Sequence, residues 1–190
     1  MKIHDITRDL LTAPVFPGDI TPTAVSVSST ADGDTHNKVH LLLSSHSGTH
    51  IDAPAHFVHG ARTIDQMELS RFVGLCTVWE TCGEFTVAEI APVLAVCEKR
   101  LIIKGDIVIT RETAQAIVDA GILLLGTECL SVGKEGTFTD IHLILLGGET
   151  LILENIDLST VVQGRYTLCA LPLKIGGCDG AQCRAVLIED

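Results

Sequence analysis

A stretch of eleven residues, 46–56, constrains the fold more than any other part of the chain. It reads His-Ser-Gly-Thr-His-Ile-Asp-Ala-Pro-Ala-His, and its four chelating side chains all stand at even positions: His46, His50, Asp52 and His56. Residues two apart on an extended strand point to the same face, so a strand would gather these groups on one face. A helix is disfavoured because Gly48 and Pro54 interrupt it. We therefore expect a strand that continues from residues 38–45 and ends near Pro54.

These side chains predict a metal site. Imidazole and carboxylate ligands together suit zinc, manganese or iron. The alternative is that they are ordinary polar residues of a loop, which is the better explanation for a lone histidine. Four chelating groups on one face favour the metal.

A second group of candidate ligands lies in the C-terminal half. Thr139 or Asp140 can cap a short helix that carries His142. Glu154 ends an apolar strand over residues 151–154, and a buried carboxylate needs a partner. From the residues alone, that partner is either a metal or one of the arginines Arg165 and Arg184.

The rest of the pattern predicts an α/β fold with a mixed sheet. Further strands are expected over residues 2–6, 22–30, 73–79, 107–110, 122–125, 165–173 and 184–188. One helix is expected over 87–99, because Thr86 and Glu89 form a capping box at its start. A second is expected over 112–120 and ends at Gly121.

Composition limits the class of protein. At 190 residues, with 46% hydrophobic and 19% charged residues, we expect one globular domain over residues 1–190. A net charge of −11 argues against nucleic acid or an anionic membrane as partner. No stretch reaches the roughly 20 apolar residues of a membrane span, and the N-terminus lacks the apolar core of a signal peptide. The seven cysteines form no CxxC pair, so we expect reduced thiols and a cytoplasmic protein.

The motif at 46–56 resembles the signature of the metal-dependent cyclase family, which includes bacterial arylformamidases (kynurenine formamidases) and isatin hydrolases. Similarity extends to a His and a Glu twelve residues apart, here His142 and Glu154. It extends also to Leu-Pro-Leu-Lys followed by Gly-Gly and Asp-Gly-Ala near the C-terminus. The resemblance implies a swivelling β/β/α fold, a homodimer or higher homo-oligomer, and hydrolysis of an aryl formamide to an aromatic amine and formate.

The resemblance also implies roles for single residues. One metal ion would be held by His46, His50 and Asp52, and a second by Asp52, His142 and Glu154. Zinc is the first expectation for both ions and manganese the alternative. His56, beyond the bend at Pro54, would shuttle a proton as general base and then acid.

Phe16 is the candidate for substrate binding. Between Pro14 and Pro17, its side chain either lines a pocket or plugs the core. The family has a Trp-Pro-Gly-Asp-like element near its substrate pocket, and Phe16 occupies the aromatic position. The resemblance therefore implies that Phe16 packs on the aryl ring of a small aromatic amide.

Three other interpretations stay open. The same site could hydrolyse another amide or a lactam such as isatin. The protein could be a non-catalytic metal-binding or interaction module. The residues could also be purely structural, with no metal.

Overall fold

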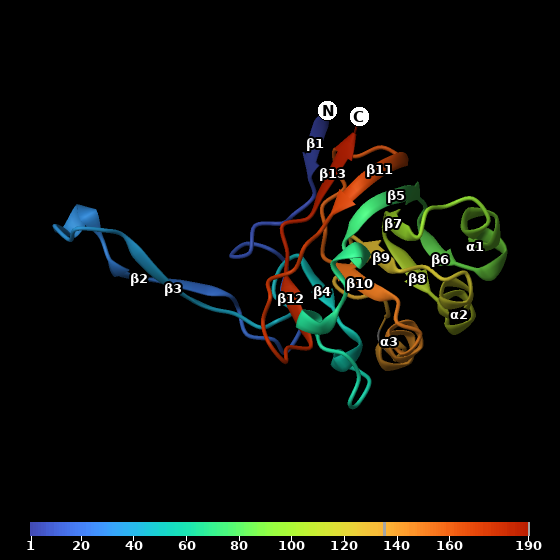
Figure 1. Ribbon diagram of the computed structural model, residues 1–190, viewed down its shortest axis with the longest axis horizontal. Helices are drawn as coiled ribbons and strands as arrows, with labels where there is room; N and C mark the ends of the chain where they lie inside the picture. Colours follow the sequence, from blue (N-terminus) through green and yellow to red (C-terminus); the bar gives the residue numbers. More distant parts are fainter. Residues whose placement is uncertain (135, 190) are drawn as a thin grey trace.

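The computed structural model describes residues 1–134 and 136–189, and a curled nine-stranded sheet dominates it (Figure 1). The strand order is β1-β13-β11-β5-β7-β9-β10-β4-β12. The strands of this sheet are β1 (Lys2–Asp5), β4 (His50–Asp52), β5 (Val73–Glu80), β7 (Arg100–Lys104), β9 (Leu124–Thr127), β10 (Leu151–Glu154), β11 (Gly164–Cys169), β12 (Gly180–Gln182) and β13 (Val186–Glu189). The expected α/β fold with a mixed sheet is confirmed, and the swivelling arrangement stays a prediction.

Parallel pairing forms the centre of the sheet and antiparallel pairing its two sides. Strands β5, β7, β9 and β10 run parallel, whereas β1, β13 and β11 on one side, and β4 and β12 on the other, pair antiparallel. The central strands are buried on both faces, which explains why β9 and β10 read as nearly continuous apolar runs.

Three helices cover the outer face of β7, β9 and β10: α1 (Val87–Leu94), α2 (Arg111–Asp119) and α3 (Phe138–Gly147). The capping box of Thr86 and Glu89 is confirmed at the start of α1. That helix ends at Leu94 rather than at residue 99, because the chain must turn back to reach β7. The Glu98 backbone N–H already bonds to the Thr77 hydroxyl of β5 at 3.0 Å.

The helix that carries His142 begins earlier than expected. Its N-cap is Thr137, not Thr139 or Asp140. Asp140 lies in the first turn, where an acidic side chain is favourable, and pairs with Arg111. The strand expected over 165–173 ends at Cys169, and the loop after it contains the short strand β12, which the sequence did not indicate. Another short pair, β6 (Gly83–Phe85) with β8 (Ile107–Ile109), lies beside the main sheet.

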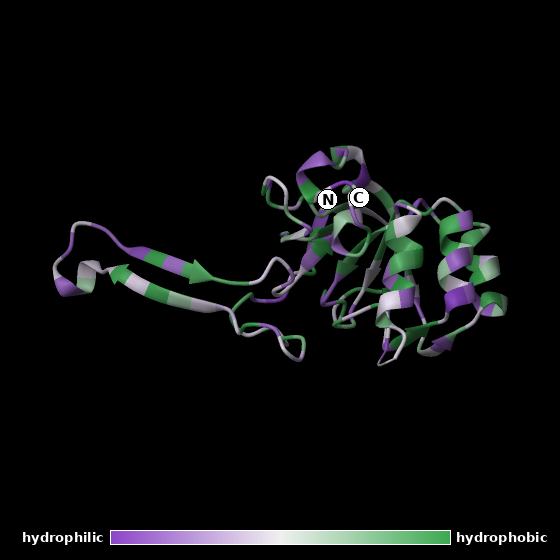
Figure 2. Cartoon of the chain, turned by 90° about the horizontal axis from the view of Figure 1, so that it is seen from below, coloured by the Kyte–Doolittle hydropathy of each residue, from purple (hydrophilic) through white to green (hydrophobic). Residues whose placement is uncertain are grey.

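The expectation that residues 38–45 lead straight into the 46–56 motif is wrong. Strand β3 (Lys38–Leu42) pairs with β2 (Thr23–Ser28) in a hairpin that projects from the body (Figures 1 and 2). The chain then turns, with the Ser44 N–H donating to Ser47 Oγ at 3.0 Å. Gly48 has φ +64, against Leu10, so an extended conformation breaks there and only β4 remains a strand.

No helix in the described part of the chain has the length and apolar character needed to cross a membrane.

Candidate metal centre

Strand β4 supplies the middle of the site. His50 and Asp52 point to one face of the strand, while Ile51 points to the core on the other face. The antiparallel register places Glu154 of β10 directly opposite His50, so the two side chains lie on the same face. His142 comes from α3, and the four side chains are all buried: His50, Asp52, His142 and Glu154.

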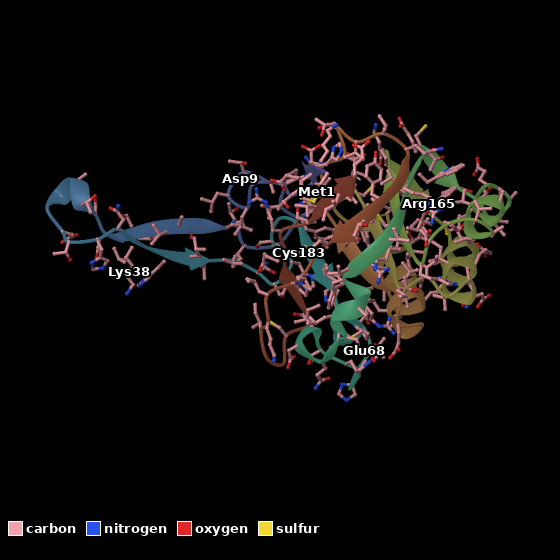
Figure 3. All side chains as sticks on the ribbon, turned by 45° about the horizontal axis from the view of Figure 1, so that its top comes forward. Met1, Asp9, Lys38, Glu68, Arg165 and Cys183 are labelled. Carbon is pink, nitrogen blue, oxygen red and sulfur yellow. The ribbon has the colours of Figure 1, made fainter. Side chains whose placement is uncertain are left out.

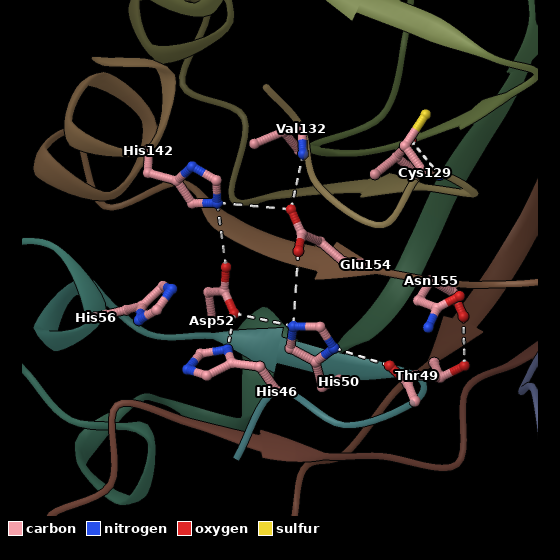
Figure 4. A network of polar contacts seen from close by, with 12 residues as sticks. His46, Thr49, His50, Asp52, His56, Cys129, Val132, His142, Glu154 and Asn155 are labelled. Atoms are coloured by element: carbon pink, nitrogen blue, oxygen red, sulfur yellow. Dashed lines mark hydrogen bonds and ion pairs between the residues drawn. The ribbon is translucent and has the colours of Figure 1, made fainter. Parts of the chain in front are cut away.

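These four groups close a ring (Figure 4). His50 Nε2 lies 3.3 Å from Asp52 Oδ1 and 3.6 Å from Glu154 Oε2. His142 Nε2 lies 3.7 Å from Asp52 Oδ2 and 3.6 Å from Glu154 Oε1. Each imidazole thus faces one oxygen of each carboxylate, at distances longer than good hydrogen bonds.

The far nitrogen of each imidazole is anchored to the backbone. Nδ1 of His50 lies 2.9 Å from the Gly48 carbonyl, and Nδ1 of His142 lies 2.7 Å from the Phe138 carbonyl. An N–H at Nδ1 would donate to each carbonyl, which leaves the Nε2 lone pair directed into the ring. Metal-binding histidines are oriented in this way in other proteins.

The two buried carboxylates, Asp52 and Glu154, would be stabilised by a cation between them. Asp52 is fully buried, and among the described residues its Oδ2 has no hydrogen-bond partner. Burial, and then the neighbouring Asp52 charge, raise the pKa of Glu154 above its ordinary value. Glu154 Oε1 also accepts the Val132 N–H at 2.8 Å, which holds the carboxylate in place. Two buried anions, an unpartnered oxygen and two oriented imidazoles fit a divalent metal with mixed nitrogen and oxygen ligands.

His46 adjoins the ring from the turn before β4, not from the strand itself. Its Nδ1 lies 2.8 Å from Asp52 Oδ1 and its Nε2 lies 2.9 Å from Asp179 Oδ2. Burial alone would lower the pKa of His46, but the hydrogen bonds to the two carboxylates outweigh it and raise the pKa to about 9.

His56 lies on the short 3-10 turn Pro54–His56, stacked on His46 at 3.9 Å between ring centroids. Its Nδ1 lies 3.1 Å from Asp179 Oδ2. Burial lowers the pKa of His56, although the Asp52 charge opposes this. A lowered pKa favours the neutral ring, the form that can accept a proton.

Chelating atoms come within 4.8 Å of one another in two groups that share Asp52. One joins Asp52 to His50 and Glu154, and the other joins it to His46 and His56. The structure therefore brings together all six residues that the sequence singled out around the metal. These two groups differ from the two ligand sets expected from the family resemblance. Those two ligand sets stay a prediction.

Asp179 is the site residue that sequence reasoning missed. Its backbone carbonyl accepts the Ala53 N–H at 2.9 Å, which fixes it beside β4 just before β12. Ser45 Oγ donates to the other carboxylate oxygen, Oδ1, at 2.9 Å. The one feature of the sequence that pointed to Asp179 was the Asp-Gly-Ala segment near the C-terminus, which resembles the family.

The site opens into a cavity of about 240 Å³. Its polar floor includes His46, His50, His56, His142 and Glu154, and aromatic walls come from Phe16, Phe57 and Phe138. The Phe16 and Phe138 rings pack edge to face at 5.4 Å. A cavity with apolar walls and a few converging polar groups suits a small organic ligand.

Fold and site define an α/β protein with a buried His/Asp/Glu cluster that opens into an aromatic cavity, and comparison with known proteins agrees. The Cyclase family model matches residues 4–112. A kynurenine formamidase from Erythrobacter litoralis is 32% identical over 204 residues, which cover 99% of this chain and 94% of that protein. The chain therefore belongs to the cyclase family, and the resemblance predicted from the motif is confirmed.

Solved structures extend the likeness over the whole fold. A structure described as a potential metal-dependent hydrolase with cyclase activity has a TM-score of 0.85 at 25% identity, covering 98% of this chain and 96% of that one. Isatin hydrolase A from Labrenzia aggregata shares the fold with a TM-score of 0.86 at 20% identity, over 100% of this chain and 94% of that chain.

Proposed function

We propose that this protein hydrolyses an aryl formamide of the N-formylkynurenine type to an aromatic amine and formate. The observation that carries the proposal is the buried ring of two carboxylates and two imidazoles at the floor of an aromatic cavity. Five residues would hold the metal, proposed as two zinc ions with manganese as the alternative: His46, His50, Asp52, His142 and Glu154. When bound, such ions supply Lewis acidity and make water a nucleophile at neutral pH.

His56 would move the proton. Its Nδ1 faces Asp179, which leaves Nε2 for the reaction. We assign Nε2 the role of general base toward the attacking water and then of general acid toward the leaving nitrogen. A C–O bond forms at the formyl carbon, the C–N bond breaks, and the departing amine takes the proton from His56.

Phe16 would position the aryl ring. It faces the cavity together with Phe57 and Phe138, so a flat substrate can lie between apolar side chains while its formyl group reaches the polar floor. The resemblance puts a tryptophan of the family at this position, where this chain has the smaller ring of phenylalanine.

A substrate panel tests the proposal. N-formylkynurenine and simple N-formyl anilines should be hydrolysed with higher kcat/KM than isatin. A chelator should abolish turnover, and zinc or manganese should restore it. Full activity in metal-free protein would contradict the metal role.

The second candidate is hydrolysis of a cyclic amide, favoured by the fold shared with isatin hydrolase A. The aromatic cavity accommodates either kind of substrate. If the protein hydrolyses isatin with a higher kcat/KM than the formamides in the same panel, the proposed substrate is wrong. The proposed metal ligands would be unaffected by that result.

A further inference from the structure

Residues 9–22, which we call the Phe16 segment, contain neither helix nor strand and supply Phe16 to the wall of the cavity. Hydrogen bonds within the segment are local: the Ala13 N–H donates to the Asp9 carbonyl at 2.8 Å, and the Asp19 N–H donates to the Phe16 carbonyl at 3.0 Å. Figure 3 shows Asp9, where the segment begins, at the margin of the body beside the base of the β2–β3 hairpin. Irregular surface segments of this kind have low local stability unless other residues hold them.

In the part of the chain that the structure describes, one hydrogen bond joins the Phe16 segment to the other residues. Asn155 Nδ2 donates to the carbonyl of Pro14, two residues before Phe16, at 3.2 Å. The Phe16 ring also packs edge to face on Phe138, at 5.4 Å between ring centroids. The polar attachment of the segment therefore depends on the side chain of Asn155.

Asn155 is itself fixed to the strands of the candidate metal centre (Figure 4). It directly follows Glu154 at the end of β10, and only 3% of the residue is exposed. Its carbonyl accepts the Thr49 hydroxyl at 2.7 Å, and its N–H donates to the Cys129 carbonyl at 3.1 Å. Because Thr49 precedes His50 of β4, these bonds hold Asn155 between the two strands that supply His50 and Glu154.

The backbone of Asn155 is left-handed, with φ +57. Among the described residues, Glu149 is the one other non-glycine residue with a positive φ. Asparagine adopts this conformation more readily than most residues, and glycine adopts it without steric cost. The backbone conformation alone would therefore accept a glycine, and what asparagine adds here is a side chain that donates to Pro14. Residues in sparsely populated backbone conformations are frequent at functional sites.

We propose that Asn155 is a positioning residue for substrate binding: its amide holds the Phe16 segment against the metal centre, so that the Phe16 wall of the cavity is formed before a substrate arrives. A wall that is already in place improves affinity, because binding does not then have to order the segment. Asn155 is not among the residues that line the cavity, so it acts through Phe16. The effect on substrate rests on the proposed function, whereas the attachment of the segment does not.

Asn155→Gly tests the proposal on the full chain, because it keeps the left-handed backbone and removes the donor. Hydrogen–deuterium exchange measured by mass spectrometry should become faster in a peptide spanning residues 9–19 and stay unchanged in β4 and β10. With N-formylaniline as substrate, KM should rise about 2–10-fold, the scale of one lost hydrogen bond, while kcat and metal content stay near those of the wild type. Asn155→Asp keeps the shape, but the ionised side chain cannot donate, so it should show the same two effects.

Asn37→Gly is the matched control, since Asn37 is the other asparagine of the chain and is exposed just before β3. It should leave the exchange of residues 9–19 and KM unchanged. Circular dichroism should show native structure in each variant, and Asn155→Asp decides if Asn155→Gly does not fold. Unchanged exchange over residues 9–19 in a folded Asn155 variant overturns the proposal. Loss of metal, or a fall in kcat at unchanged KM, also overturns it, because Asn155 would then act on Glu154. A wild type that does not hydrolyse N-formylaniline would contradict the proposed function, and the exchange comparison would still decide whether Asn155 holds the segment.

Discussion

His56 lies among the chelating residues, but its contacts differ from theirs. It faces no carboxylate of the buried ring within 4 Å; it contacts Asp179 and stacks on His46. We expect His56→Ala to keep its metal while kcat falls by about 10²–10⁴, or roughly 3–5 kcal/mol of barrier. His50→Ala should lose metal and activity together, because His50 is part of the ring. Metal content and kcat, measured on both variants, distinguish these roles. Loss of metal in His56→Ala would show that His56 is a ligand, and an unchanged kcat would show that it has no catalytic role.

Asp179 acts through the histidines it touches. Asp179→Asn keeps the shape of the side chain but removes the charge facing His46 Nε2 and His56 Nδ1. We expect a loss of about 10–100-fold in kcat, the usual effect of removing such a partner. The carboxylate favours protonated His56, so its loss lowers the pKa of His56. The acid limb of the pH profile of kcat/KM should therefore move to lower pH.

The matched control for this variant is Asp119→Asn at the end of α2, which is isosteric; Asp119 does not line the cavity, and its Oδ1 accepts from Gln115 of the same helix. It should leave the pH profile in place. An Asp179→Asn enzyme with reduced kcat but an unmoved acid limb would mean that Asp179 serves folding alone. Asp179 could not be predicted from periodicity, because 133 residues separate it from His46 and only the pairing of β12 with β4 brings them together.

A bound metal would link helix α3 to the sheet. His142 comes from α3, whereas His50 and Glu154 come from β4 and β10. Removing a cation leaves Asp52 and Glu154 buried with like charges. We expect chelation to lower the melting temperature: metal at 100 times its Kd contributes about 2.7 kcal/mol. That is roughly 5–10 °C for a chain of this size.

Differential scanning fluorimetry with and without chelator measures this shift. Asp52→Asn, which removes the shared carboxylate charge, should make the melting temperature insensitive to chelator. An unchanged melting temperature of the wild type after chelation, with metal loss verified by elemental analysis, would show that the ring holds itself without an ion.

The sequence predicted most elements and misplaced their limits for identifiable reasons. Strands such as Leu151–Glu154 could be predicted because a short, almost wholly apolar segment is typical of a strand buried on both faces. The strand through 46–56 was not continuous, because Gly48 takes a left-handed conformation that residue type permits but does not require. The alternation over residues 22–30 indicated a strand correctly. It could not indicate that both faces of that strand would be exposed. An alternating pattern shows which side chains are polar, but it does not show whether another part of the protein packs on either face.

The seven cysteines are spread over the whole molecule, and their reactivity tests the expectation of reduced thiols. All seven are free thiols, with Cys82 exposed and Cys76 and Cys183 buried. Burial raises the pKa of both Cys76 and Cys183 to about 12. At pH 8 their thiolate fraction is smaller by a factor on the order of 10³ than that of an ordinary cysteine. Native protein should therefore react with a thiol reagent in two phases, and Cys76 and Cys183 should belong to the slow one.

Denatured, unreduced protein should give all seven thiols in one fast phase. Because the thiolate is the reactive form, raising the pH from 7 to 9 should speed the fast phase of the native protein until the ordinary pKa is passed. The rate of the slow phase should keep rising with pH over this range, because the pKa of both buried thiols is higher. Burial of these thiols, or the opening of the core, limits that rate. Cys76→Ala with Cys183→Ala should remove the slow phase and leave the fast one. Two or more thiols missing from freshly purified, denatured protein would show a disulfide, and would contradict the expectation of a reducing compartment.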